Sequence, residues 1–430
     1  MTDVRGGATA ELAVLCNGEP VGALRRHRGR LSLTYLDSWR RREDATPVSL
    51  SMPLAAQEHP HRVVDPFLWG LLPDNDAVLA RWGRDFQVST SHPFGLLAHV
   101  GEDLPGAMQL VRPERIAQLE GIKAGAKVTW LDTADVADML GGVRRDHTAW
   151  LAHRAEGRWS LAGAQPKIAL LRDGDRWGRP TGRTPTTHIL KPAVAGLDEH
   201  DLNEHLCLRA ARQLGLRAAH TEVGVFGGER AIVVERYDRI RSGKTWQRVH
   251  QEDMCQALGL HPSAKYQSDG GPSPADIVTL LRTAIPSGAA DPAVMSFLDA
   301  LAFNWLIAGP DAHAKNYAVL LAGPQVRLAP LYDIASALAY PDLHPPKVKL
   351  AMKIGGCYRL SAIGPTAWVR LAEEVRVEPD LLIDRIRVLI DRVADAFSTA
   401  AADPEVVALK SPLPSRLVDA IAERSHTLRL

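Results

Sequence analysis

A polar segment, Gly309-Pro-Asp-Ala-His-Ala-Lys-Asn-Tyr317, contains the residues whose types and spacing are best suited to chemistry. Asp311 precedes Asn316 by five positions, and an apolar helical pattern comes before the segment while a predicted strand, Ala318 to Leu321, follows it. A carboxylate can accept the proton of a hydroxyl, and a neutral amide oxygen can bind Mg²⁺ without adding a second charge. The pair therefore predicts phosphoryl transfer; the alternative is a polar loop whose Asp and Asn form local turn bonds.

A second acidic residue, Asp333, ends the apolar stretch Leu328-Ala-Pro-Leu-Tyr. An Asp at the end of a strand, soon after an Asp/Asn loop, is placed to bind the same Mg²⁺, as in protein kinases. Taken alone, a strand-end Asp more often caps the backbone. Its position after Asp311 and Asn316 favours the metal-binding interpretation.

Two upstream segments have properties suited to holding phosphates. Lys191 ends a predicted strand, and Pro192 stops that strand, which helps to fix where the ammonium group points. For Lys191 alone the alternative is a surface lysine. The small residues of Ser160-Leu-Ala-Gly-Ala-Gln-Pro-Lys167 would let backbone N–H groups approach phosphate oxygens, although the segment lacks the glycines of a P-loop.

Taken in order, these segments resemble the HipA toxin kinases, the kinase halves of bacterial toxin–antitoxin pairs. The matching motifs are Ser160-x-Ala-Gly-Ala-Gln-x-Lys, His-Ile-x-Lys191-Pro, Asn203-Glu204, Val-Val-Glu235-Arg-Tyr-Asp-Arg, Asp311-x-His-x-Lys-Asn316 and Pro330-x-Tyr-Asp333. The first hundred or so residues, including Pro66-Phe-Leu-Trp-Gly-Leu-Leu-Pro73-Asp, resemble the N-terminal domain of that family. The likeness extends roughly from Leu12 to Val393.

The resemblance implies a role for each matching residue. Asp311 would be the catalytic carboxylate, and Asn316 and Asp333 would bind Mg²⁺. Lys191 would hold the phosphates of ATP, and the loop from Ser160 would cover them. The implied nucleotide-binding set comprises Ser160, Ala162, Gly163, Ala164, Gln165, Lys191, Val234, Glu235, Arg236, Tyr237, Asn316 and Asp333, with the 234–236 backbone at the adenine. In the family the loop serine, here Ser160, is autophosphorylated, and a dianion there would disturb a loop that holds other phosphates.

Three further residues accompany this set. His313 is grouped with Asp311 as a catalytic candidate; a histidine that braces the loop by hydrogen bonds is the alternative, because phosphoryl transfer depends mostly on positioning and charge. Glu204 is expected to pair with Lys191, as a helix glutamate does in other kinases. Gly309 stands where the family commonly has an Asn, which predicts weaker turnover if that Asn supports the loop.

The function implied by the resemblance is an ATP- and Mg²⁺-dependent Ser/Thr protein kinase toxin. Its substrate would be a translation component such as an aminoacyl-tRNA synthetase. A small, HipB-like DNA-binding antitoxin would neutralise the kinase. The kinase would reach operator DNA only through this antitoxin. Two alternatives stay open. One is a small-molecule kinase on the same scaffold, a class that does not share the Ser160 loop in this form. The other is an ATP-binding pseudokinase acting as corepressor, for which Gly309-Pro310 is the sequence support.

The elements needed to position these residues predict an α+β, two-lobed protein-kinase-like fold. Residues 1–120 would form a small N-terminal α/β subdomain, 121–240 the kinase small lobe, and 241–430 a mainly α-helical C-terminal lobe. Strands are predicted at Leu12–Cys16, Val21–Leu24, Leu31–Tyr35, Ile168–Leu171, His188–Leu190, Val223–Phe226 and Ala231–Val234. Helices are predicted at Pro66–Trp82, Pro93–Val100, Leu131–Gly141, Asn203–Leu214, Met295–Ile307 and around Leu382–Phe397. Residues 172–187 are predicted to form an exposed hairpin loop and 263–274 a mobile loop.

The composition argues against several other classes of protein. A net charge of +1 in 430 residues gives no strong field toward nucleic acid or acidic membranes. The four cysteines lack the spacing of a metal site or a redox motif. The chain has no apolar run near the ~20 residues of a membrane span, and its start lacks a signal-peptide pattern. These features predict a cytoplasmic protein that does not enter a membrane.

Overall fold

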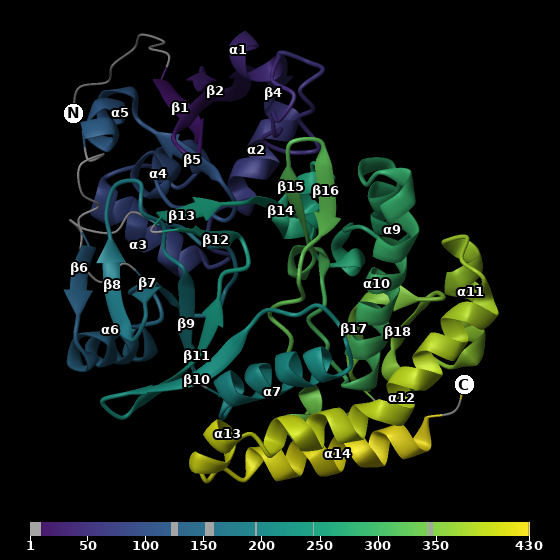
Figure 1. Cartoon of the computed structure of the whole chain (residues 1–430). Coiled ribbons are helices and arrows are strands. Elements are labelled where there is room, and N and C mark those ends of the chain that lie inside the picture. The colour runs from purple at the N-terminus through teal and green to yellow at the C-terminus, as the bar shows by residue number, and fades with distance from the viewer. Residues whose placement is uncertain are drawn as a thin grey trace.

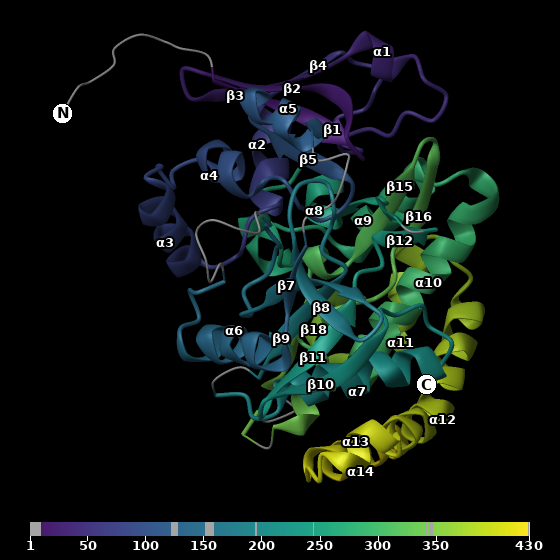
Figure 2. The same ribbon diagram turned by 60° about the vertical axis from the view of Figure 1, so that its left-hand side comes forward.

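The computed structural model describes residues 10–121, 128–150, 159–193, 196–243, 245–340, 342–343, 347–428 and 430. An N-terminal sheet lies at one end of the molecule, and the long C-terminal helices α12 (Pro379–Ala401) and α14 (Leu413–Thr427) lie at the other (Figures 1 and 2). A second sheet and its helices lie between them. The arrangement is the mixed α+β fold predicted from the sequence. No helix within the described ranges is long and apolar enough to cross a lipid bilayer.

The N-terminal unit is an antiparallel sheet with strand order β4-β3-β2-β1-β5. Its strands are β1 (Ala10–Cys16), β2 (Glu19–His27), β3 (Arg30–Tyr35), β4 (Glu58–Pro60) and β5 (Met108–Val111). Its helices are α1 (Asp37–Arg40), α2 (His61–Gly70), α3 (Asp76–Phe86), α4 (Pro93–Val100) and α5 (Pro113–Gly121). Alternate residues of β3, such as Leu31, Leu33 and Tyr35, are buried in a core that includes Phe67 of α2, as expected for a strand with one covered face.

The single helix predicted over Pro66–Trp82 is wrong, because the chain turns between α2 and α3. Asn75 Oδ1 accepts hydrogen bonds from the N–H groups of Ala77 and Val78, at 3.1 and 3.2 Å, and so caps a new helix. The apolar periodicity on both sides concealed this break. The resulting turn, residues 71–75, reaches the site described below.

The second sheet has the strand order β10-β11-β9-β7-β8-β6. Its strands are β6 (Val128–Leu131), β7 (Ile168–Asp173), β8 (Arg176–Pro180), β9 (His188–Pro192), β10 (Thr221–Phe226) and β11 (Glu229–Glu235). Its faces are covered by α6 (Thr133–Arg145) and α7 (His200–Gln213). In β11, Ala231 and Val233 pack with α6, whereas Ile232 and Val234 pack in the core that contains α7. This alternation places the sheet between two helices.

The hairpin predicted around residues 172–187 is confirmed, because β7 and β9 pair antiparallel, but its connection is not an exposed loop: residues 176–180 form β8 and pair with both β6 and β7. Gly178 allows the close approach of β6, since a Cβ atom there would lie 2.4 Å from Val128 Cγ1. Trp177 packs edge-on against Phe226, with ring centroids 5.9 Å apart. Pairing and packing with distant segments thus overrode a local composition typical of loops.

The remaining chain is mainly helical, with small hairpins. Its helices are α8 (Met254–Ala257), α9 (Pro274–Ala284), α10 (Ser287–Leu306), α11 (Pro365–Glu374), α12, α13 (Pro404–Ala408) and α14. Its strands are β12 (Arg239–Ser242), β13 (Thr245–Arg248), β14 (His250–Asp253), β15 (Ala318–Ala322), β16 (Gln325–Leu328), β17 (Lys349–Ile354) and β18 (Cys357–Arg359). The C-terminal half of α10 is buried on all sides, as expected for a central helix. The segment predicted as a mobile loop contains two short 3₁₀ turns, η2 (Pro262–Ala264) and η3 (Gln267–Asp269).

A buried ionic cluster joins the N-terminal unit to the second sheet. Asp103, on the loop before β5, accepts hydrogen bonds from the backbone and side chain of Thr186 at 2.9 and 2.7 Å. It also accepts bonds from Arg239 at 2.9 Å and Arg248 at 3.4 Å. Burial alone would raise the pKa of Asp103, but the surrounding arginines outweigh it and lower the pKa. The charged carboxylate therefore holds three segments together.

We expect Asp103→Asn to lower the free energy of unfolding by about 3–5 kcal/mol, because the change leaves buried arginines without their counter-charge while keeping the side-chain shape. The matched control is Asp173→Asn, which breaks a pair with Arg241 (3.1 Å) whose side chains are both about half exposed. That control is expected to stay within about 1 kcal/mol of wild type. Urea denaturation of both variants measures the difference, and equal midpoints would contradict the structural role of Asp103.

Candidate active site

Asp311 and Asn316 lie on a short loop between α10 and β15, whose path is fixed at the end of α10. Ala308 has a left-handed backbone conformation with φ 52°, and Gly309 N donates to Asn304 O at 2.7 Å. A Cβ atom on Gly309 would lie 2.6 Å from Asn304 Oδ1. The glycine at this position therefore makes room for an amide side chain supplied by α10.

Within the loop, the two predicted functional side chains are held differently. Asn316 is buried, and its Nδ2 donates to Asp311 O at 2.6 Å, so that Oδ1 is the acceptor left for a cation. The Asp311 side chain is 60% exposed and can reach an incoming group. From the other side, Tyr332 Oη donates to Lys315 O at 2.6 Å. The loop thus presents a fixed amide and an accessible carboxylate.

Asp333 lies beyond β16 in an unusual backbone conformation. Its φ is 57°, a left-handed geometry that costs a non-glycine residue roughly 1–3 kcal/mol. The preceding segment is held in place because Leu331 N donates to Arg217 O at 2.7 Å and Ala219 N donates to Leu331 O at 2.8 Å. Strain of this kind persists where surrounding contacts fix the backbone. The left-handed conformation directs the Asp333 carboxylate toward Lys191.

Lys191, at the end of β9, is the centre of a buried charge cluster. Its Nζ lies 2.8 Å from Asp333 Oδ1, and 2.8 and 3.1 Å from the two carboxylate oxygens of Glu204 on α7. The predicted pairing of Glu204 with Lys191 is confirmed by these contacts. Three elements far apart in the sequence, β9, α7 and the turn after β16, therefore meet at one ammonium group.

The protonation of this cluster follows from burial and mutual attraction. Burial would lower the pKa of Lys191, but Asp333 and Glu204 outweigh it and raise the pKa. Burial would raise the pKa of Asp333, and the charges of Lys191 and Lys167 lower it instead. For Glu204 burial prevails and the pKa rises. The ammonium group and Asp333 therefore stay charged near neutral pH.

The predicted phosphate loop, residues 160–165, crosses between the N-terminal unit and β7. Gly163 has φ 100° and bridges to the N-terminal turn, since its O accepts from Asp74 N at 3.0 Å. Ser160 is fully buried, with its Oγ donating to Leu71 O at 2.7 Å. The serine hydroxyl is thus held against the N-terminal unit, away from solvent.

Lys167, which sequence reasoning did not select, supports this loop from within. Its Nζ donates to Ala162 O at 2.6 Å and lies 5.1 Å from the centre of the Trp150 ring. A Cβ atom on Gly163 would come within 2.7 Å of the same Nζ. Burial, with a contribution from Lys191, lowers the pKa of Lys167 to about 8. The lysine at the end of the loop motif was the signal that could have identified it.

These residues share one cavity of about 750 Å³. Of the residues predicted from the sequence, its lining includes Ala162, Gly163, Ala164, Gln165, Lys191, Val234, Glu235, Arg236, Tyr237, Asp311, His313, Asn316 and Asp333. Glu204 and Lys167 line it as well. Ser160 is adjacent through the backbone of Leu161, but its own side chain is buried elsewhere. The cavity brings together the phosphate-binding, metal-binding and catalytic candidates.

The segment predicted to meet the adenine, Val234 to Tyr237, forms one wall of the cavity. Glu235 N and Arg236 N are engaged with backbone carbonyls, of His220 and Thr187 respectively, both at 2.9 Å. The Arg236 side chain is buried in the ionic cluster of Asp103. Tyr237 packs against Tyr332, with centroids 5.8 Å apart. If an adenine base binds here, this segment can contact it only through its carbonyl groups, the Tyr237 amide and the rings of Tyr237 and Tyr332.

The N-terminal unit contributes a residue that sequence reasoning missed, Asp74. Its carboxylate bonds to Lys315, which lies between Asp311 and Asn316 on their loop, and to Lys265, the latter at 3.1 Å. Burial would raise the pKa of Asp74, but the two lysines lower it. The motif Leu-Leu-Pro-Asp74 resembles the family, but nothing in its local pattern indicates a partner 241 positions away.

His313 lies beside the Asp311 carboxylate, with Nε2 3.9 Å from Asp311 Oδ1. Burial lowers its pKa, so the ring is neutral at physiological pH. Its ring contacts Tyr266 edge-on at 4.9 Å, and its backbone N donates to Asp311 O at 2.8 Å. These contacts fit the bracing role better than that of a general base.

The donor set suits Mg²⁺ supplied together with a nucleotide. Asp333 offers a charged carboxylate and Asn316 a buried amide oxygen on the same cavity wall. Among the described residues no group of three or more His, Cys, Asp or Glu side chains is arranged to hold a metal ion. Mg²⁺ is commonly bound by one or two carboxylates plus phosphate oxygens, so two protein ligands are sufficient.

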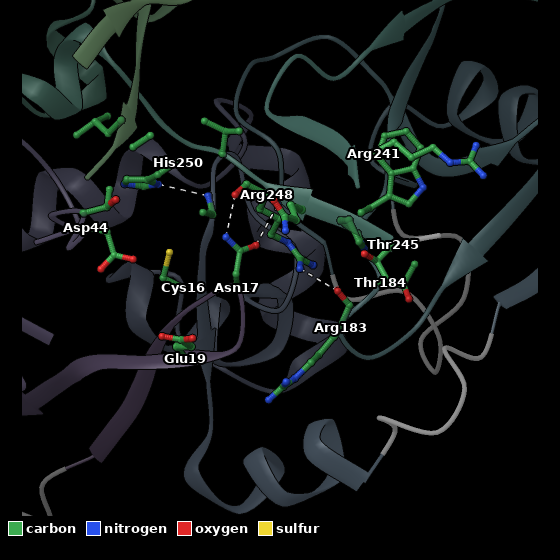
Figure 3. A pocket seen from close by; sticks show the side chains of 18 of the residues that line it. Cys16, Asn17, Glu19, Asp44, Arg183, Thr184, Arg241, Thr245, Arg248 and His250 are labelled. Carbon is green, nitrogen blue, oxygen red and sulfur yellow. Dashed lines mark hydrogen bonds between the residues drawn. The ribbon is translucent and has the colours of Figure 1, made fainter. Parts of the chain in front are cut away.

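A second cavity, of about 1420 Å³, is lined by residues of the N-terminal sheet and of the hairpins β12–β13 and β15–β16, among others (Figure 3). Asn17 and Arg248 exchange two hydrogen bonds there, both at 2.9 Å, and Arg248 also donates to Arg183 O at 2.8 Å. None of the predicted site residues lines it. The chemistry predicted from the sequence is thus confined to the smaller cavity.

Comparisons with known proteins agree with this geometry. Residues 12–111 match the HipA N-terminal domain, and residues 159–401 match the HipA-like C-terminal domain. The chain is 36% identical to the putative kinase Y4mE of Sinorhizobium fredii, over 97% of this chain and 98% of that protein. It is 28% identical to the serine/threonine-protein kinase toxin HipA of Shewanella oneidensis, over 88% of this chain and 84% of that toxin.

The fold is likewise that of a solved structure, the Shewanella oneidensis HipA in a complex with HipB and operator DNA. The TM-score is 0.80 at 24% identity, covering 96% of this chain and 97% of that chain. Together the two family matches cover the segments that line the cavity, and the relatives match the chain over most of its length. The protein therefore belongs to the HipA family of serine/threonine protein kinases.

Proposed function

We propose that this chain is a toxin kinase that uses ATP and Mg²⁺ to phosphorylate a serine or threonine hydroxyl of a protein. The observation that carries the proposal is the meeting of Lys191, Asp333 and Asn316 in one cavity with the exposed carboxylate of Asp311. Each group has a part in phosphoryl transfer, a reaction governed by positioning and electrostatics.

Each of these residues has a separate proposed role in the reaction. Lys191 and the amides of the phosphate loop hold the α and β phosphates, while Glu204 keeps the ammonium group in place. Asp311 accepts the proton of the acceptor hydroxyl as its oxygen attacks the γ-phosphorus and ADP departs. When bound by Asn316 and Asp333, Mg²⁺ would neutralise charge on the phosphate oxygens. The Asn304 amide beside Gly309 donates to Ala300 O at 2.9 Å and to Tyr317 Oη at 3.4 Å.

Self-inactivation through Ser160 has a physical basis in this structure. The Ser160 hydroxyl is fully buried and bonded to Leu71 O, so no room is left for a phosphate dianion. A phosphorylated Ser160 would have to leave this position, and its displacement would break the backbone hydrogen bond between Gly163 and Asp74. The loop that holds ATP phosphates would then be displaced.

The partners we propose follow from the relatives. The Shewanella HipA is in complex with HipB and operator DNA, and by analogy a small DNA-binding antitoxin would neutralise this kinase and link it to an operator. A translation component, such as an aminoacyl-tRNA synthetase, is the proposed protein substrate. A cytoplasmic location accords with both partners.

The proposal predicts that wild-type protein incubated with Mg²⁺ and ATP gains the mass of one phosphate, whereas Asp311→Ala does not. Removing the carboxylate is expected to slow transfer by about 10²–10⁴-fold, because the hydroxyl loses its proton acceptor. Intact-mass spectrometry provides the measurement. Ser160→Ala serves as the control for the acceptor site. An equal gain of phosphate by the wild type and Asp311→Ala would refute the site assignment.

We also propose that Asp74 is a positioning residue, which makes the N-terminal unit part of the active site. Asp74→Asn is expected to lower kcat about 100-fold, because Lys315 loses the anchor that holds the catalytic loop. KM for ATP should not rise, since the change frees two lysines that line the same cavity from their counter-charge. The initial rate of phosphotransfer as a function of ATP concentration separates the two constants.

The control for this change is Asp76→Asn, which removes the same charge from an exposed position two residues away. It should keep the wild-type kcat. A loss of kcat accompanied by an equal rise of KM and a lower melting temperature would instead indicate general disruption of the N-terminal unit.

A further inference from the structure

The catalytic carboxylate is already in contact with a hydroxyl group of the chain itself. Tyr266 Oη donates a hydrogen bond to Asp311 Oδ1 at 2.5 Å, although the two residues are 45 positions apart. Tyr266 lies at the end of the segment that follows η2, and it lines the active-site cavity. No role in the reaction described above requires this phenol.

Several contacts hold Tyr266 in this place. Lys265 O accepts from Ala314 N at 3.1 Å, and Lys265 Nζ is bound by Asp74 at 3.1 Å. Tyr266 O accepts from Gly271 N at 2.9 Å, in a turn so tight that a Cβ atom on Gly271 would lie 2.2 Å from Ala264 O. The Tyr266 hydroxyl is thus held at Asp311 by a loop whose conformation is fixed by these hydrogen bonds.

The position that the phenol occupies is the one an acceptor needs. A hydroxyl about to be phosphorylated must donate to the catalytic carboxylate at roughly 2.6–3.2 Å. Water can make the same contact, and ATP hydrolysis is then the competing reaction. In that reaction a water oxygen attacks the γ-phosphorus, the bond to the β-γ bridging oxygen breaks, ADP leaves with the electron pair, and the water proton passes to Asp311.

We infer that Tyr266 is a specificity-determining residue, which occupies Asp311 Oδ1 and keeps water from that oxygen until a protein hydroxyl displaces the phenol. The inference rests on the proposed kinase function. The edge-on contact with His313 at 4.9 Å returns the ring to the same place after each displacement. A protein acceptor bound through many contacts can displace one hydrogen bond of about 0.5–3 kcal/mol, whereas a single water gains little by doing so.

The test compares Tyr266→Phe with the wild type and with Tyr358→Phe, a tyrosine on β18 outside the cavity lining. The full-length proteins are treated with phosphatase, the phosphatase is removed, and ADP release is followed during the first minutes with Mg²⁺–ATP and no protein substrate. Tyr266→Phe keeps the ring against His313 and removes only the hydroxyl. We expect its ADP release to rise about tenfold with an unchanged KM for ATP, and Tyr358→Phe to match the wild type.

An unchanged or lower rate of ADP release by Tyr266→Phe would overturn the inference, because the hydroxyl would then be inert or would assist the reaction. Asp311→Ala distinguishes this result from failure of the proposed function. If the wild type and Asp311→Ala release ADP equally, Asp311 has no catalytic role, and the function and the inference fall together. If Asp311→Ala is slower and Tyr266→Phe is not faster than the wild type, only the inference fails.

Discussion

The active site depends on one buried ammonium group and the two carboxylates that neutralise it. Lys191 could not stay charged in this interior alone, because desolvation of an unpaired charge costs several kcal/mol. Glu204 and Asp333 remove that penalty only if β9, α7 and the turn after β16 are correctly docked. The left-handed backbone of Asp333 and its supporting bonds to residues 217–219 are consequences of the same requirement. Electrostatic pairing thus adds a specific contact where the second sheet and the helical part of the chain meet, alongside their shared hydrophobic core.

The N-terminal unit is bound to this site through two loops that carry carboxylates. The turn at residues 71–75 reaches the phosphate loop through its backbone and the catalytic loop through Asp74. The loop before β5 places Asp103 among the arginines next to the segment Val234 to Tyr237 that lines the cavity. Trp159 and Leu161, which begin the phosphate loop, belong to the hydrophobic core of the N-terminal unit. The phosphate loop therefore lies between two cores, and a shift of either one is transmitted to it.

Local patterns predicted the parts of this arrangement that are encoded locally. The separation of Asp311 and Asn316, and the periodicity of α10, α12 and the N-terminal strands, reflect hydrogen bonding and burial within short segments. The sequence also predicted the Glu204–Lys191 pair, because a helix glutamate near a strand lysine has kinase precedent. Asp74 and Tyr266 were missed because their partners lie far along the chain, and β8 was missed because its own composition is typical of a loop although it pairs with the adjacent β7. Only docking of the separate units reveals such contacts, and a turn rich in Gly, Pro and Arg looks the same before that docking as an exposed loop.

The position of Ser160 connects the geometry of the loop to its chemistry. The serine cannot be phosphorylated where it lies, since its hydroxyl is buried and donates to Leu71 O. Releasing it requires the loss of this bond and of the Gly163–Asp74 bond, each of which contributes about 0.5–1.5 kcal/mol, together with exposure of Leu161. If the chain phosphorylates itself at Ser160, as proposed above, transfer to that hydroxyl would need this opened conformation, whereas a docked protein substrate would need only to displace Tyr266. Under that proposal the closed loop would favour transfer to an external protein over transfer to the kinase itself.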